Sequence, residues 1–170
     1  MAIRFAGFWG GTLWGTNSQD ILWGGIGDDR IFGFGSSDLI YGGYGDDALF
    51  GGSGMDHLRG AAGTDTLRGG LGADLLSGGS DSDYFVFHAA DGTATDTIRD
   101  FEIGEDRLVL GNGLAVTASR FADIDRDGED DTVLALSNRA TIVLLGVGEA
   151  EDWSLAGPNV MQPYELDLLA

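Results

Sequence analysis

The sequence predicts an all-β protein: a parallel β-roll, or right-handed β-solenoid, of nine-residue repeats with an antiparallel β cap at its C-terminal end. Three observations predict this fold. Glycine contributes 30 of the 170 residues and proline only 2, which indicates periodic turns rather than collagen or a proline-rich linker. Residues 15–86 divide into blocks of nine without insertion or deletion. Beyond residue 86 the period stops, and short alternating apolar runs follow, separated by turn residues.

The chain divides into three parts. Residues 1–14 are expected to form an N-terminal cap, a decayed coil whose Leu13 points inward but which lacks the aspartate of the repeats. Residues 15–86 form the roll. Residues 87–170 form a β-rich C-terminal cap, because the end coil of a solenoid would otherwise expose its core and an open sheet edge. The first residues make a poor secretory signal peptide, and no apolar run reaches membrane-spanning length.

Three positions of the nonapeptide keep the same character in all eight blocks. Position 1 is always glycine: Gly15, Gly24, Gly33, Gly42, Gly51, Gly60, Gly69 and Gly78. Position 6 is always aspartate: Asp20, Asp29, Asp38, Asp47, Asp56, Asp65, Asp74 and Asp83. Position 8 is always large and apolar: Leu22, Ile31, Ile40, Leu49, Leu58, Leu67, Leu76 and Phe85. Such a strict period predicts a repeat architecture.

The pattern has a direct geometrical interpretation. Glycines at positions 1, 2 and often 4 allow a tight turn, because glycine adopts positive φ at little cost. Positions 7–9 are extended, with position 8 pointing into the core and its neighbours pointing outward. Two nonapeptides then make one coil, and stacked coils form two parallel sheets with about 4.8 Å per layer.

Stacking places like turns above one another and so produces two columns of aspartate. One column carries Asp20, Asp38, Asp56 and Asp74, and the other carries Asp29, Asp47, Asp65 and Asp83. Carboxylates at this spacing repel one another strongly in a partly dry groove. A hard divalent cation resolves the repulsion. Calcium fits better than magnesium because it takes about six to eight oxygen ligands, whereas magnesium is smaller and dehydrates reluctantly.

Charge and composition exclude several classes of function. The formal net charge of −19 at pH 7 disfavours nucleic acid and anionic membranes as partners. The absence of cysteine excludes disulfides and Cys-ligated zinc sites. The sequence contains neither H-E-x-x-H nor G-x-S-x-G. We therefore predict that the chain is not an enzyme.

The blocks resemble the G-G-x-G-x-D-x-U-x pattern of the repeats-in-toxin (RTX) calcium-binding family. In that family each ion lies between the turns of alternate repeats, held by the position-6 aspartate and by carbonyls of the glycine turn. The resemblance therefore implies a ligand set made of the position-6 aspartates Asp20, Asp29, Asp38, Asp47, Asp56, Asp65, Asp74 and Asp83. It adds Asp81 and the turn glycines Gly24, Gly25, Gly27, Gly42, Gly43, Gly45, Gly51, Gly52, Gly54, Gly60, Gly63, Gly69, Gly70, Gly72, Gly78 and Gly79.

Not every turn matches the family pattern equally well. The best sites are expected between the turns that begin at Gly24 and Gly42, Gly42 and Gly60, Gly60 and Gly78, and Gly51 and Gly69. The turns at Gly15 and Gly33 lack glycine at positions 2 and 4. We therefore expect about four to six calcium ions in the roll.

The segment after the repeats resembles the flank of serralysin-type proteases, alginate epimerase modules and other type I secretion substrates. Strands are expected over 84–87, 96–101 and 104–110, and a hairpin over 132–136 and 141–145. Residues 165–170 resemble an uncleaved C-terminal signal of type I secretion. The resemblance implies an extracellular protein that is secreted without an N-terminal signal peptide. Its partners are then the type I secretion machinery and calcium, which induces its folding.

An acidic run over 123–131 has two interpretations. It fits the first half of an EF-hand loop, but Leu134 occupies the position of the bidentate glutamate. The run is either an acidic hairpin turn, which we favour, or an additional weak calcium site in the cap.

The outward position 9 is aromatic in the early coils, at Trp14, Trp23, Phe32, Tyr41 and Phe50. Such a stripe indicates a contact surface for a sugar, a partner or a second copy of the chain, with self-association favoured among these. Cross-strand stacking or packing under the N-terminal segment explains it equally well. Two functional alternatives therefore remain beside calcium-induced folding: a carbohydrate- or partner-binding adhesion module, and a non-catalytic accessory module of a secreted epimerase or protease.

Overall fold

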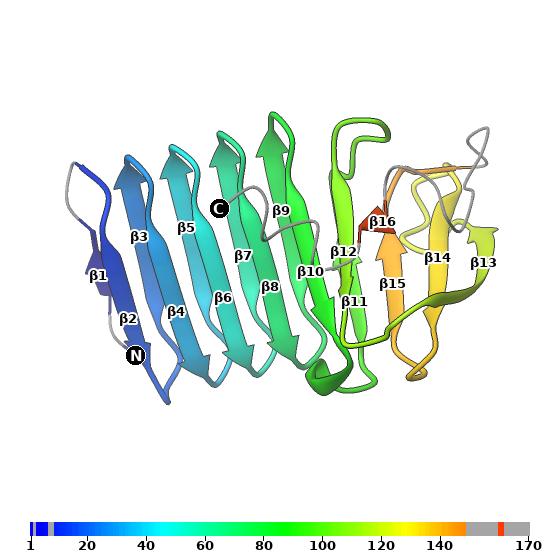
Figure 1. The fold of residues 1–170 in the computed structure, drawn as a ribbon, viewed down its shortest axis with the longest axis horizontal. Coiled ribbons are helices and arrows are strands. Elements are labelled where there is room, and N and C mark those ends of the chain that lie inside the picture. The colour runs from blue at the N-terminus through cyan, green and yellow to red at the C-terminus, as the bar shows by residue number, and fades with distance from the viewer. Residues whose placement is uncertain (2, 7–8, 149–159, 162–170) are drawn as a thin grey trace.

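The computed structural model describes residues 1, 3–6, 9–148 and 160–161. Its strands form two sheets that are stacked coil upon coil along the long axis of the molecule (Figure 1). The nine-stranded sheet has the order β1 (Ile3–Phe5), β3 (Ile21–Ile26), β5 (Leu39–Tyr44), β7 (His57–Ala62), β9 (Leu75–Ser80), β11 (Thr95–Ile98), β15 (Thr141–Leu144), β14 (Asp131–Leu136), β13 (Val116–Ala122). The seven-stranded sheet has the order β16 (Val160–Met161), β12 (Arg107–Gly111), β10 (Tyr84–His88), β8 (Thr66–Leu71), β6 (Ala48–Ser53), β4 (Arg30–Gly35), β2 (Thr12–Thr16). One 3₁₀ turn, η1 (Ala89–Asp91), follows β10.

Successive strands of the repeats alternate between the two sheets, and each pairs in parallel with the strand one coil further on. Leu22 is opposite Ile40, and Leu49 is opposite Leu67. The offset between these partners is the length of two nonapeptides. The predicted all-β parallel solenoid with an antiparallel group at its end is therefore confirmed. In the described part of the chain, no helix is long and apolar enough to span a membrane.

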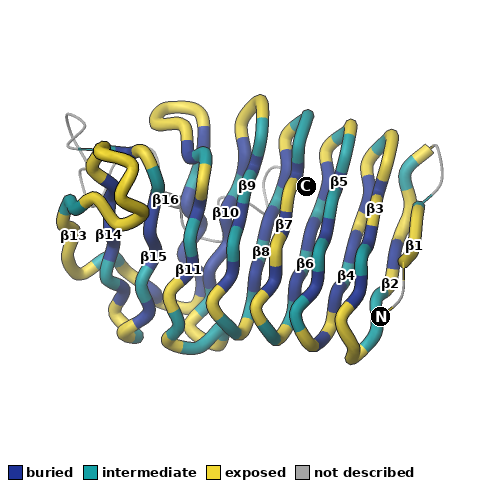
Figure 2. The backbone as a smooth tube through the Cα atoms, turned by 180° about the vertical axis from the view of Figure 1, so that it is seen from behind, coloured by how far each residue is buried: buried dark blue, intermediate teal, exposed yellow. Residues whose placement is uncertain are grey.

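The core is the thin layer between the two sheets, and it consists mainly of the position-8 side chains. Those of the eight repeats are 0–2 % exposed. Figure 2 shows the buried residues along the middle of the strands and the exposed residues at most of the turns. Burial of each such side chain contributes about 1.5–3 kcal/mol. The inward orientation predicted for position 8 is therefore confirmed.

The strands of the repeats are longer than predicted. Most of them run for six residues, from position 7 of one block to position 3 of the next, as β5 does. The reason lies in position 2, where Gly43 has a positive φ of 129° and remains extended. Its neighbours therefore continue the ladder, with Gly25 opposite Gly43 and Ile26 opposite Tyr44. Only positions 4–6 remain as the turn.

Parallel stacking continues beyond the repeats at both ends. On the N-terminal side β2 pairs with β4, and its Leu13 is 9 % exposed, facing the core as expected. On the C-terminal side β11 pairs with β9 and β12 pairs with β10, which places Ile98 opposite Leu76 and Leu108 opposite Phe85. The nine-residue sequence period ends at residue 86, but the coil geometry does not.

The far end of the longer sheet is antiparallel. β14 pairs with β15 around a turn in which Arg139 has a φ of 76°, so the predicted hairpin is confirmed. The strand expected over 96–101 ends at Ile98, and Phe101 turns into the core instead. β13, which was not predicted, pairs with β14; its residues are mostly exposed and show no alternation in burial. The predicted secretion signal over 165–170 lies outside the described residues.

Candidate metal centre

The aspartates at position 6 are buried in the turns and connect one coil to the next. All eight are 0–3 % exposed. The backbone N–H of Asp47 donates to Oδ1 of Asp65 at 2.8 Å, and Asp65 donates in the same way to Asp83. The other column has the same arrangement, for example from Asp38 to Asp56 at 2.8 Å. The two predicted series of aspartates therefore form two columns of hydrogen-bonded carboxylates.

The second carboxylate oxygen of these residues has no hydrogen-bond partner among the described residues. This holds for Oδ2 of Asp29, Asp38, Asp47, Asp56, Asp65, Asp74 and Asp83, and also for Oδ1 of Asp29. A buried polar atom without a partner costs about 1–3 kcal/mol, and more when it is charged. Since the unpartnered atoms are oxygens and recur once per turn, they indicate a cation at each of these turns.

The glycine at position 1 gives this carboxylate its space. A Cβ on Gly60 would lie 2.1 Å from Oδ2 of Asp65 and 2.7 Å from the carbonyl oxygen of Gly78. Gly42 and Gly51 show the same conflict with Asp47 and Asp56. Because position 1 does not take a positive φ, our sequence-based explanation of this glycine was wrong. It is needed for the close approach of a carboxylate and of the next coil, whereas positions 2 and 4 take the positive φ.

The carboxyls are strongly perturbed. Burial raises the pKa of Asp65 to about 8 and that of Asp83 to about 7. Donated backbone N–H groups lower these pKa values in part, and aspartates of neighbouring turns raise them again. For the same reasons the pKa rises to about 6 at Asp38, Asp47, Asp56 and Asp74. Without a cation, the columns therefore favour protons over ionisation.

Comparison with known proteins agrees with this geometry. Residues 14–49, 35–58 and 50–85 match the model of the RTX calcium-binding nonapeptide repeat, in four copies. Residues 14–85 are RTX calcium-binding repeats. Repeats of this family are typical of secreted proteins and are generally not catalytic, so the match assigns no enzymatic activity to the chain.

Two solved structures are similar to the chain. The AlgE6R3 subunit from the Azotobacter vinelandii mannuronan C5-epimerase has 25% sequence identity and a TM-score of 0.44, covering 91% of this chain and 87% of that chain. The extracellular lipase LipA from Serratia marcescens has 19% identity and a TM-score of 0.40 over 94% of this chain, which spans 40% of the lipase chain. No curated protein matches the chain significantly.

The two RTX turns that depart from the pattern behave differently. Phe34 and Ser36 take positive φ values of 78° and 70°, so the turn at Gly33 keeps the backbone geometry of the others. The turn at Gly15 does not adopt these angles. There the Thr16 hydroxyl donates to Oδ2 of Asp20 at 2.8 Å and supplies the partner that the other aspartates lack. The first turn is thus stabilised without a cation.

Ala61 provides a stability test of this turn geometry. It occupies position 2 with a φ of 99°, an angle that glycine adopts in most other turns. We expect Ala61→Gly to stabilise the calcium-loaded chain by about 1 kcal/mol, because it relieves this strain. Urea denaturation at saturating calcium measures the effect. Ala62→Gly, at the neighbouring position with ordinary φ, should destabilise by about 0.5–1 kcal/mol; equal effects of the two variants would contradict the assignment.

Sequence analysis missed two aspartates that extend the columns into the cap. Asp96 accepts a hydrogen bond from the N–H of Asp74 at 2.9 Å, and Asp106 accepts one from Asp83 at 2.9 Å. Both side chains are buried, and each precedes an inward apolar residue by two positions, Ile98 and Leu108. This D-x-U spacing is the only trace of the repeat in the cap sequence, and it could have identified both residues.

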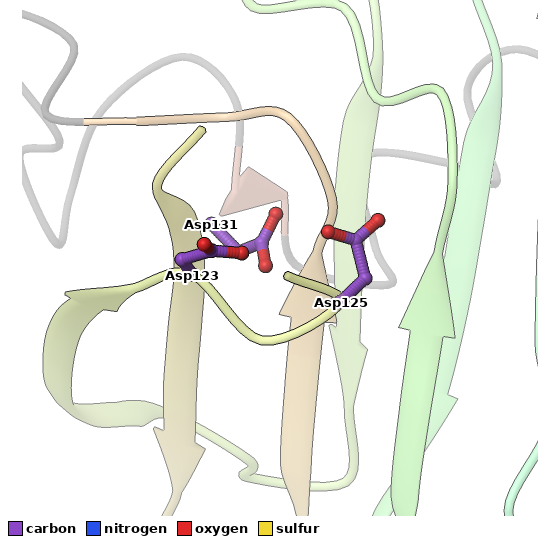
Figure 3. Close-up of side chains that lie close together, drawn as sticks. All are labelled: Asp123, Asp125 and Asp131. Carbon is purple, nitrogen blue, oxygen red and sulfur yellow. The ribbon is translucent and has the colours of Figure 1, made fainter. Parts of the chain in front are cut away.

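The acidic run over 123–131 brings three carboxylates together in the connection between β13 and β14 (Figure 3). Ligand atoms of Asp123, Asp125 and Asp131 lie within 4.8 Å of one another. Both oxygens of buried Asp131 already accept backbone N–H groups, from Ile124 at 2.7 Å and from Gly146 at 2.9 Å. The run does connect two antiparallel strands, as a hairpin turn should, and cation binding there stays a prediction.

The aromatic side chains at position 9 stack along both sheets. Trp23 and Tyr41 have ring centroids 4.2 Å apart, and Trp14, Phe32 and Phe50 form a second ladder with spacings of 4.5 and 4.8 Å. This is the cross-strand stacking expected from one of the two interpretations. A groove beside the first ladder is lined by Trp23, Tyr41 and Arg59. Self-association or ligand binding through this face stays a prediction.

Proposed function

We propose that the RTX repeats bind calcium through the position-6 aspartates and the carbonyls of the glycine turns, and that this binding drives folding of the chain. The observation that carries the proposal is the set of buried carboxylate oxygens without partners, one per turn from Asp29 to Asp83. Calcium is the ion of choice because its coordination is flexible and takes carboxylate and carbonyl oxygens together.

The distribution of these oxygens supports the predicted number of ions. They occur at all turns of the repeats except the one at Gly15, where Thr16 replaces the cation. Intervals between suitable turns therefore begin at Gly24, Gly42 and Gly60 in one column and at Gly33 and Gly51 in the other. This agrees with about four to six ions in the roll.

The same geometry provides a switch between compartments. Where calcium is scarce, unneutralised carboxylates and the conformational entropy of the glycines oppose folding, so the chain stays able to pass through a type I secretion channel. Outside the cell, at about millimolar calcium, the sites fill and the binding free energy becomes folding free energy. The protein is then an extracellular calcium-folded module.

A calcium titration tests the proposal. Far-UV circular dichroism should show little β structure in a chelator and a cooperative gain with calcium, but not with the same concentration of magnesium. Calorimetry should give several ions per chain. A β spectrum that is complete in chelator and unchanged by calcium would mean that the core and cap hold the fold without ions.

A further inference from the structure

The column that contains Asp83 continues into the cap and changes character there. Arg107 donates its N–H to the carbonyl oxygen of Asp83 at 2.8 Å, as Tyr84 does to Asp65 in the preceding coil. Asp106 accepts the Asp83 N–H through Oδ1, but its Oδ2 accepts the N–H of Glu102 at 2.9 Å. Asp106 is therefore fully hydrogen-bonded and closes the column.

Asp83 itself is left with an unsatisfied oxygen. It is 1 % exposed, and its Oδ2 has no partner among the described residues. This oxygen lies against Gly78, where a Cβ would be only 2.1 Å away. The N–H of Gly78 donates to Oδ1 of Asp100 at 3.0 Å. A second carboxylate, supplied by the cap, therefore binds the same glycine that Asp83 contacts.

Two further observations point to the same position. After burial, the charges of Asp106, Asp100 and Asp81 are the main influences that raise the pKa of Asp83. Asp81 occupies position 4 of its turn with a φ of 76°, where Gly27, Gly45 and Gly63 occur in the preceding coils of this column. An aspartate kept in a conformation that favours glycine indicates that its side chain has a role there.

No basic side chain neutralises this group. Within the described ranges the one ion pair joins Arg68 to Asp91, and the guanidinium of Arg107 donates to the backbone carbonyls of Glu105 and Asp106. The acidic residues around Asp83 therefore need an external cation. The resulting site lies at the boundary of the residues that match the RTX repeats, which end at residue 85.

We propose that Asp83, Asp100 and Asp81 bind a calcium ion at the junction of the roll and the cap, with Asp106 as a positioning residue that holds Asp83 through its backbone. This inference rests on the proposed function, since it assumes calcium as the cation. The junction site gathers more carboxylates than an interval between two repeats, and calcium affinity rises with ligand charge. It is therefore the tightest site of the chain.

The test compares three variants of the full chain. Asp100→Asn keeps an oxygen that accepts the Gly78 N–H but removes the charge. Asp81→Gly removes a ligand while relieving its positive φ, so it does not weaken the backbone. Glu105→Gln is the matched control, because it removes an exposed charge from the same cap turn. The readouts are calorimetric calcium titration and the number of ions retained at limiting calcium, measured by native mass spectrometry.

We expect the highest-affinity calcium to bind about tenfold or more weakly in Asp100→Asn and in Asp81→Gly, and to bind normally in Glu105→Gln. Unchanged affinity and ion number in both variants, while the unsubstituted chain binds calcium, would overturn the junction site alone. A failure of the unsubstituted chain to bind calcium would instead overturn the proposed function.

Discussion

Gly60→Ala is expected to remove the two calcium sites that share its turn and to destabilise the folded chain by about 3 kcal/mol or more. The added Cβ would lie 2.1 Å from Oδ2 of Asp65 and 2.7 Å from the carbonyl oxygen of Gly78. One of these atoms is a ligand candidate and the other belongs to the next coil. The turn can accept the methyl group only by displacing the carboxylate or by separating the coils.

Urea denaturation at saturating calcium and a calorimetric count of ions measure both effects. Gly11→Ala is the control, since a Cβ there would meet no atom within 4 Å and its φ is not positive. It should leave the stability and the ion count nearly unchanged. If Gly60→Ala keeps the full ion count and loses less than about 1 kcal/mol, the turn relaxes more easily than its packing indicates.

Most of the fold was predictable because the repeat expresses it at every turn. Position 8 is apolar in each block, and a nine-residue period with a single inward residue leaves only a two-sheeted roll as a way to bury it. The same period aligns the aspartates, so the two columns followed from counting along the sequence. β13 lacks such a signal, because its stability comes from pairing with β14 rather than from an alternating pattern of its own.

The candidate site was predictable only in part, because contacts between coils are not written in any single repeat. The role of Gly60 depends on the position of Oδ2 of Asp65 and on the next coil, neither of which local sequence rules describe. Thr16 satisfies Asp20 through a hydroxyl that the repeat pattern records only as a missing glycine. Asp106 joins the column after an irregular spacing of 23 residues, so a strict period overlooks it.

Acidification is expected to stabilise the calcium-free chain. Burial raises the pKa of Asp65 to about 8 and that of Asp83 to about 7, whereas the unfolded value is 3.8. The folded state therefore binds more protons than the unfolded state between about pH 4 and pH 8, so the free energy of unfolding falls as pH rises through this range. Going from pH 8 to pH 5 should increase it by an amount on the order of 5 kcal/mol.

Calcium should reverse this dependence. Bound calcium holds the same carboxyls ionised, so protons compete with it, and the calcium-loaded chain should lose stability as pH falls below about 6. Urea denaturation at pH 8, 6.5 and 5, in calcium-stripped buffer and in saturating calcium, gives both slopes. A calcium-free chain that loses structure on acidification over this range would contradict the argument.

Asp65→Asn separates the two effects at a single residue. The amide cannot ionise, so this variant no longer buries the carboxyl whose pKa is raised most among those with stated values. We expect it to be more stable than the unsubstituted chain at pH 8 without calcium, and less stable at saturating calcium, because a charged ligand is lost. A purely structural role for Asp65 would change the stability in the same direction under both conditions, since packing does not depend on calcium. The opposite signs are therefore the specific mark of a carboxylate column that needs a cation to fold.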